Sequence, residues 1–143
     1  MKHVTKENDW FLRIDPGESL MDCIISLAKE HSIKSAVILS GVGMLSFVRL
    51  GFYDIDQQRY IETEFNGIYD LNVVCGNLTW LDQEPWPHVH AVFNDASHKT
   101  ISGHVLEARC HITTELFLST NSLELHRQKL GSCPIPRLTT RLR

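Results

Sequence analysis

The sequence predicts an α+β domain: a mixed or antiparallel sheet with one main helix packed on a face. Two observations lead to this prediction. Apolar residues recur at helical spacing in the stretch 20–28, which indicates an amphipathic helix. Elsewhere the chain contains short apolar runs separated by polar turns, a pattern typical of strands that pair with their neighbours in sequence.

A strand and a turn precede the helix. Residues 10–14 form the strand, which stops at the turn sequence 15–17. Ser19 supplies a hydroxyl suited to an N-cap, and we expect the helix to end near His31. The apolar stripe consists of Leu20, Ile24, Leu27 and Ala28, widened by Met21 and Ile25.

Short apolar runs predict the strands of the sheet. Residues 35–39 indicate a buried strand that ends at 40–43, where two glycines give room for close backbone packing. Residues 48–53 and 60–65 predict a hairpin around 54–57. The remaining expected strands are 68–78, 88–93, 100–106 and 112–119.

Length and charge limit the architecture. A chain of 143 residues fits one domain, which we place at residues 1–130, followed by an irregular basic tail at 131–143. The net charge of −3 lacks the basic surplus of a duplex-binding domain. The polar segment 1–10 excludes a standard signal peptide, and no apolar run approaches the roughly 20 residues that span a bilayer. We therefore expect a soluble, cytoplasmic protein without a membrane partner.

The cysteines and glycines point to no nucleophile or dinucleotide site. The four cysteines form no C-x-x-C pair, so we expect reduced thiols rather than a zinc ribbon or a redox motif. The segment 40–43 lacks the G-x-S start of a nucleophile elbow and the third glycine of a dinucleotide fingerprint. The cysteines are Cys23, Cys75, Cys110 and Cys133.

Three histidines form the candidate metal site. If residues 88–93 are a strand, His88 and His90 point to the same face. A hairpin with the next strand would bring His104 beside them. Three imidazoles with an open fourth position suit a divalent transition metal, zinc above all. The alternative is that these histidines are solvated or hydrogen-bonded without a metal, and the residues alone leave both interpretations open.

Residues near the histidines have less defined roles. Glu107 lies on the opposite face from His104 if the strand is regular, so a role as general base requires a bulge or another subunit. Trp80, Pro85 and Trp86 wall a pocket or cover a subunit edge. No catalytic residue is assigned.

Several motifs, in order, resemble the plants and prokaryotes conserved (PPC) domain over about residues 8 to 120. These are D-P-G-E-S-L at 15–20, I-L-S-G-V-G at 38–43, L-G-F-Y-D at 50–54, P-H-V-H at 87–90 and S-G-H-V-L-E at 102–107. The resemblance implies a compact α+β subunit that assembles into a homotrimer. It also implies metal binding by His88, His90 and His104, which match stand-alone prokaryotic members position for position.

The resemblance departs from the plant proteins in two places. Plant members bind A·T-rich DNA through a preceding Arg-Gly-Arg-Pro element, which this chain does not contain. The plant partner motif Gly-Arg-Phe-Glu-Ile-Leu stands here as G-I-Y-D-L-N at 67–72, which suggests a retained strand with changed partner recognition.

Two functions follow from these observations. The first is a metal protein, acting on a small-molecule ligand, whose substrate and reaction are unassigned. The second is a trimeric DNA-binding, regulatory or protein-interaction module without catalysis. The second rests on the basic residues near the C-terminus, Arg127, Lys129, Arg137, Arg141 and Arg143.

Overall fold

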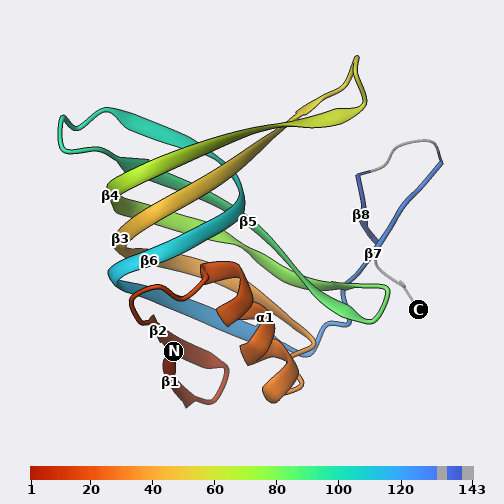
Figure 1. Ribbon diagram of the computed structural model, residues 1–143. Helices are drawn as coiled ribbons and strands as arrows, with labels where there is room; N and C mark the ends of the chain where they lie inside the picture. The colour runs from red at the N-terminus through yellow and green to blue at the C-terminus, as the bar shows by residue number, and fades with distance from the viewer. Residues whose placement is uncertain (132–134, 140–143) are drawn as a thin grey trace.

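The computed structural model describes residues 1–131 and 135–139 (Figure 1). The described elements are β1 (Lys2–Lys6), β2 (Asp9–Ile14), α1 (Leu20–Glu30), β3 (Ser35–Asp54), β4 (Arg59–Leu81), β5 (Glu84–Asn94), β6 (Thr100–Asn121), β7 (His126–Gln128) and β8 (Arg137–Thr139). This part of the chain is mostly sheet with one short helix. The expected α+β class therefore describes it only loosely.

Four antiparallel strands close into a ring. β3 pairs with β4 and β6, and β5 also pairs with β4 and β6. β2 extends the sheet beyond β6, and β1 pairs with β2 at the edge. The helix α1 contacts β5 and β6, so the predicted packing of one helix on the sheet is confirmed (Figure 1).

The strands are longer than the sequence predicts. The expected strands 35–39 and 48–53 are one continuous strand, β3, whose register against β6 shifts at four places. β4 likewise joins 60–65 to 68–78, and β6 joins 100–106 to 112–119. The prediction of separate short strands is therefore wrong. β-bulges at the register shifts let each strand bend without ending, whereas in the sequence they resemble turns.

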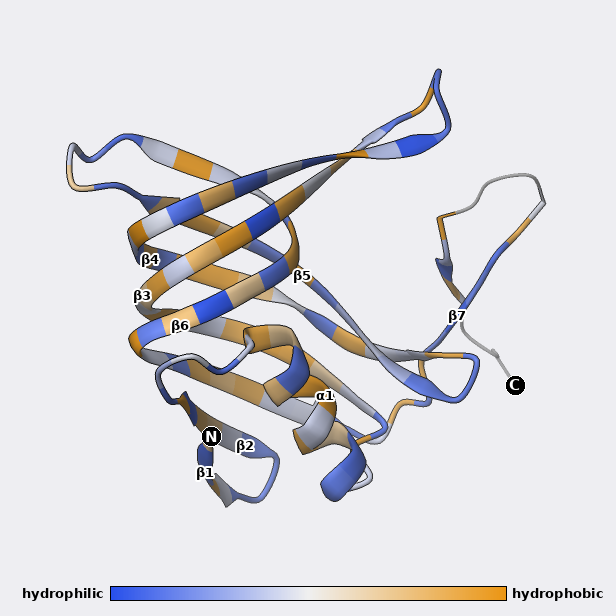
Figure 2. Cartoon of the chain, in the orientation of Figure 1, coloured by the Kyte–Doolittle hydropathy of each residue, from blue (hydrophilic) through white to orange (hydrophobic). Residues whose placement is uncertain are grey.

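Alternation along these strands builds the core. Hydrophilic and hydrophobic residues alternate along β3, β4 and β6 (Figure 2), as expected for strands with one face buried. The largest fully buried side chains are Phe93, Leu12, Ile14, Leu20, Ile24, Leu27, Ile38, Leu45, Leu78, Leu116, Leu118 and Val48. One apolar cluster therefore joins the helix to the inner face of the sheet.

The helix agrees with its sequence signals. The Ser19 hydroxyl accepts a hydrogen bond from the Asp22 backbone N–H at 3.2 Å, which caps the first turn. The C-cap is His31. The buried face consists of Leu20, Cys23, Ile24, Leu27 and Ala28. The predicted helix and its cap are confirmed.

The glycine segment is part of β3 and permits close packing, as predicted. A Cβ at Gly41 would lie 2.4 Å from side-chain atoms of Leu116 and Val74. That separation is shorter than van der Waals contact. The strand can therefore cross the core here only without a side chain.

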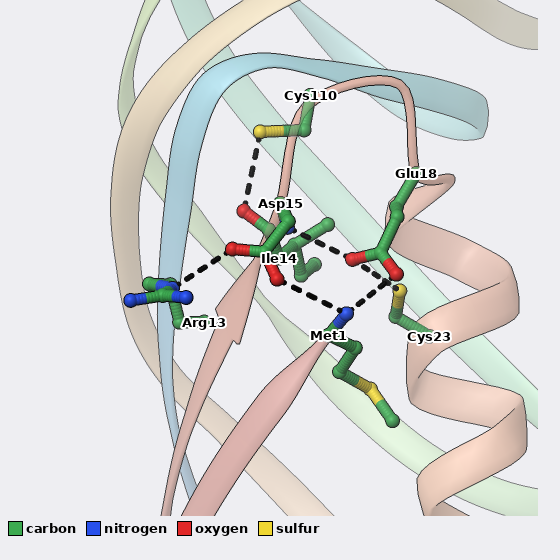
Figure 3. Close-up of polar contacts among 7 residues, drawn as sticks. All are labelled: Met1, Arg13, Ile14, Asp15, Glu18, Cys23 and Cys110. Atoms are coloured by element: carbon green, nitrogen blue, oxygen red, sulfur yellow. Dashed lines mark hydrogen bonds and ion pairs between the residues drawn. The ribbon is translucent and has the colours of Figure 1, made fainter.

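Charged groups gather where β1 meets the start of the helix (Figure 3). The Met1 amino group forms ion pairs with Asp15 and Glu18, and Arg13 Nε contacts Asp15 Oδ1 at 2.9 Å. We call Met1, Arg13, Asp15 and Glu18 the N-terminal cluster. Each positive group in it has a carboxylate partner.

The C-terminal segment returns to the sheet. β7 pairs in parallel with β4 through His126 and Trp80, and β8 pairs with β7. Arg137–Thr139 is thus a strand within the segment that the sequence predicts to be irregular. Cys133, Arg141 and Arg143 lie outside the described residues, and the domain boundary at residue 130 stays a prediction. Within the described ranges, α1 is too short to cross a bilayer.

Candidate metal centre

Two neighbouring strands bring the three histidines together. His88 and His90 lie on β5, two residues apart, and Val89 between them is fully buried in the core. Their side chains therefore share the outer face of the strand. On β6, His104 is the direct partner of His90 across the hairpin. The predicted pairing of the two histidine strands is confirmed.

The imidazole rings form a compact triangle. Their centroids are 5.3 Å apart for His88 and His90, 5.1 Å for His88 and His104, and 5.3 Å for His90 and His104. One ring nitrogen from each histidine lies within 4.8 Å of the other two. Zinc with Zn–N bonds of about 2.0–2.1 Å holds its donors roughly 3.3 Å apart. Small ring rotations can close that difference, so the residues fit a metal ion.

No anionic ligand accompanies the histidines among the described residues. Cys75 on β4 is the register partner of His90 and is an exposed free thiol, but it lies outside the group of converging ligand atoms. The centre therefore offers three neutral donors. His90 is exposed to solvent, whereas His88 and His104 are half-buried.

Burial and nearby charges favour the neutral forms of His88 and His104. Burial lowers the pKa of His104 to about 4, and the adjacent imidazoles and Arg127 act in the same direction. Burial also lowers the pKa of His88, with a further contribution from the charge of Arg127. These two rings are therefore neutral at pH 7, which is the form that binds metal ions.

Gly76 allows β4 to approach the histidine strand closely. It lies opposite Val89, and a Cβ at this position would lie 2.0 Å from the backbone oxygen of His88. No side chain can occupy that space. The position of His88 thus depends on a glycine in the neighbouring strand.

Arg127 of β7 reaches the cluster from the C-terminal segment. Its guanidinium donates hydrogen bonds to Thr79 Oγ1 at 2.9 Å, Asn77 Oδ1 at 3.0 Å and the Pro136 carbonyl at 3.2 Å. Its Nη2 also lies 3.3 Å from Nδ1 of His88. In the sequence Arg127 belongs to a basic stretch, and no sequence signal connects it with the histidines.

Tyr60 borders the cluster on another side. Its ring stacks on His104 with centroids 5.9 Å apart. A cavity of about 250 Å³ lies beside the exposed His90. Its lining consists of Val73, Cys75, His90, Ala91, Val92, Ser102 and Gly103.

Glu107 does not face the histidines. The register of β6 against β3 shifts between His104 and Glu107, so the strand is bulged rather than regular. The carboxylate contacts Arg49 at 3.4 Å and Arg109 at 2.6 Å. These ion pairs hold Glu107 away from the converging histidine nitrogens.

Trp80 on β4 and Trp86 on β5 have different surroundings. Trp80 lines a separate cavity of about 520 Å³ that includes none of the three histidines. Its indole N–H donates to the Ile33 carbonyl at 3.0 Å. Trp86 is exposed, and its place at a subunit edge stays a prediction.

One family model matches most of the chain. The model of the Plants and Prokaryotes Conserved (PCC) domain, which is the PPC domain above, matches residues 1–122. No sequence among the curated proteins matches the chain.

Three solved structures share the fold. A candidate DNA-binding protein from Bacteroides thetaiotaomicron is 17% identical, with a TM-score of 0.91 and 96% of each chain covered. A PPC protein from Pyrococcus horikoshii is 22% identical, with a TM-score of 0.80 over 91% of this chain and 90% of that one. A metal-containing protein from Archaeoglobus fulgidus is 21% identical, with a TM-score of 0.82 and 96% of each chain covered.

Proposed function

Because the chain belongs to the Plants and Prokaryotes Conserved domain family, we propose that His88, His90 and His104 form a metal centre that binds a small-molecule ligand, with zinc as the metal. The observation that carries this proposal is the convergence of three ring nitrogens within 4.8 Å from two paired strands. The fold shared with a metal-containing archaeal protein supports it.

The surrounding residues suit a centre that remains open on one side. Three imidazoles leave at least one coordination position free, and a metal there acidifies bound water or polarises an oxygen of the ligand. Exposed His90 and its adjacent cavity provide access. Half-buried His88 and His104 fix the other two donors from within the sheet. No reaction is assigned.

Metal analysis of the purified untagged chain tests the proposal. We expect about one zinc ion per chain by plasma mass spectrometry after supply of the metal, and less than a tenth of that in His88→Ala and His104→Ala. His111→Ala is the matched control, because His111 lies on β6 but outside the cluster. Metal retained by both cluster variants, or absent from the wild-type chain after supply, would contradict the proposal.

DNA binding is the second candidate, supported by the fold shared with the candidate DNA-binding protein from Bacteroides thetaiotaomicron. Lys129 and Arg137 are exposed, but the Arg127 guanidinium contacts Asn77, Thr79 and His88 instead of facing solvent. If the C-terminal segment binds phosphates, DNA affinity falls steeply with salt and is lost on truncation after Gly131. No mobility shift at low salt would exclude this candidate.

We propose a homotrimer as the assembly. The outer face of β3 and β6 exposes a patch of apolar side chains, formed by Val37, Leu39, Val42 and Phe117. Contiguous apolar surface of this kind commonly marks an interface. Light scattering of the wild-type chain should give three times the monomer mass, and Phe117→Lys should reduce it. A monomeric wild-type chain would rule out the trimer.

A further inference from the structure

Arg127 is a half-buried cation with no anionic partner among the described residues. Its four contacts go to Thr79, Asn77, the Pro136 carbonyl and His88, all of them neutral groups. Within residues 1–131 and 135–139, no carboxylate lies within ion-pairing distance of its guanidinium. A desolvated cation without a counter-charge is unfavourable, so its position beside the histidines requires a reason.

A metal held by His88 would change the contact of this residue with Arg127. A neutral imidazole has one lone pair and one N–H. While Nδ1 of His88 accepts from Arg127 Nη2, the proton is on Nε2 and that atom cannot bind a metal. If Nε2 of His88 held the metal, the proton would be on Nδ1, and if Nδ1 held it, the lone pair of Nδ1 would be occupied. In both cases one N–H of Arg127 would lose its acceptor on His88.

The positive charge of the three histidines with a bound metal ion would favour binding of an anion. A divalent ion on three neutral imidazoles retains both of its positive charges, and Arg127 adds a third within contact of His88. Among the described residues, the converging group contains no carboxylate or thiolate to offset them. An oxyanion would neutralise part of this charge and accept the released N–H, as guanidinium groups commonly bind carboxylates and phosphates.

We propose that the site selects a small molecule through an oxyanion, a carboxylate or phosphate, that binds the metal and Arg127 Nη2 together. This inference rests on the proposed metal centre and adds the class of its ligand. Arg127 is then a binding residue that β7 supplies from the end of the domain. The exposed side of His90 and its cavity of about 250 Å³ leave space for the rest of a small molecule.

Titrations of the cobalt(II)-loaded chain test the inference, because its visible spectrum reports on metal ligands. Phosphate and acetate are added separately to the wild-type chain, Arg127→Gln and Arg137→Gln. We expect at least one anion to change the spectrum, with affinity weakened roughly tenfold in Arg127→Gln, as for one lost charge-assisted hydrogen bond. Arg137→Gln removes the same charge from β8 and should behave as wild type. The anion that binds more tightly identifies the carboxylate or phosphate class.

The metal affinity itself separates binding from a structural role. Arg127→Gln should bind cobalt(II) as tightly as wild type or more tightly, because a repelling cation is removed, while its anion affinity falls. A merely structural role would weaken both. In the wild-type chain the anion must also tighten metal binding, since the two effects are reciprocal.

The possible negative results distinguish an error in the anion proposal from an error in the metal proposal. If the wild-type chain binds cobalt but neither anion, or if Arg127→Gln keeps the wild-type anion affinity, the inference is overturned and the metal centre stands. If cobalt does not bind to the three histidines, both fail. If Arg127→Gln does not fold, the inference is tested with Arg127→Lys and with the effect of the anion on the metal affinity of the wild-type chain. An anion that leaves the wild-type metal affinity unchanged overturns the inference.

Discussion

The N-terminal cluster and the histidine cluster each contain partly buried cationic groups, but they differ in how the positive charge is balanced. In the N-terminal cluster the Met1 amino group and Arg13 are matched by Asp15 and Glu18 (Figure 3). In the histidine cluster the partners of Arg127 within the described part of the chain are all neutral groups. The charges of the N-terminal cluster are balanced by residues of the chain itself. In the histidine cluster, by our proposal, a bound anion supplies the balancing charge.

The pKa shifts in the two clusters also differ: they favour the charged forms in the N-terminal cluster and the neutral form of His104 in the histidine cluster. The Met1 amino group lowers the pKa of Glu18, and Glu18 in turn raises the pKa of that amino group, so each charge stabilises the other. Burial lowers the pKa of His104 and suppresses its charge. Mutual stabilisation is typical of a structural ion pair, whereas an enforced neutral imidazole is typical of a ligand group.

The largest expected effect concerns the histidine cluster. Zinc at 1,000 times its dissociation constant should stabilise the wild-type chain by about 4 kcal/mol, because it binds the folded state only. Urea unfolding with zinc and with a chelator measures this difference. His104→Ala should show no zinc-dependent shift, and His111→Ala should show the full one. An equal shift in His104→Ala would place the metal elsewhere.

A smaller effect is expected from the backbone that positions His88. Gly76→Ala should lower the free energy of unfolding by about 2–3 kcal/mol, as for other changes that force strain into a packed region, and should weaken zinc binding. The reason is the 2.0 Å separation between the new Cβ and the His88 backbone oxygen. Chemical denaturation and zinc titration measure the two effects.

Gly103→Ala is the control for this prediction. Gly103 adjoins His104, but the three atoms nearest to its added Cβ all belong to the Leu50 side chain, the closest at 3.1 Å. A flexible side chain can move by that amount, so we expect a loss below about 1 kcal/mol. Equal losses in the two variants would show that the close approach at Gly76 does not position the histidine.

The sequence predicts the parts of the site that depend on local periodicity. The spacing of His88 and His90 fixes their common face, and the short loop before β6 fixes the pairing with His104. Ser19 marks the helix start for the same reason, since its hydroxyl satisfies a backbone N–H three residues away. Each of these features depends on neighbours in the chain or on one hairpin.

The features that the sequence does not predict depend on contacts between residues far apart in the chain. Arg127 reaches His88 because β7 pairs with the distant end of β4 at Trp80, and a three-residue strand leaves almost no periodic signal. The continuity of β3, β4 and β6 is hidden because bulges interrupt the alternation as turns do. The bulge near Glu107 and its pairing with Arg49 likewise follow from the register between β6 and β3.

The smallest expected effect concerns the N-terminal cluster. Glu18→Gln should lower stability at pH 7 by at most about 1 kcal/mol, because this partly exposed ion pair is screened by solvent. The pKa of Glu18 is lowered from 4.5 in the folded chain, chiefly by the Met1 amino group. Its stabilisation is therefore present above pH 4.5 and lost as the pH falls through the lowered pKa.

Urea midpoints at pH 7 and pH 3 distinguish this contribution from a packing effect. The difference between wild type and Glu18→Gln should shrink as the pH falls from 7 to 3, because protonation of Glu18 progressively removes its charge. Glu124→Gln serves as the control, because Glu124 pairs with Lys34 at 3.6 Å in an exposed position and should change little at either pH. A difference that is independent of pH would mean that Glu18 acts through hydrogen bonds such as that from the Asp15 N–H. In that case charge balance would not be what completes the N-terminal cluster, and the contrast with the histidine cluster would rest on Arg127 alone.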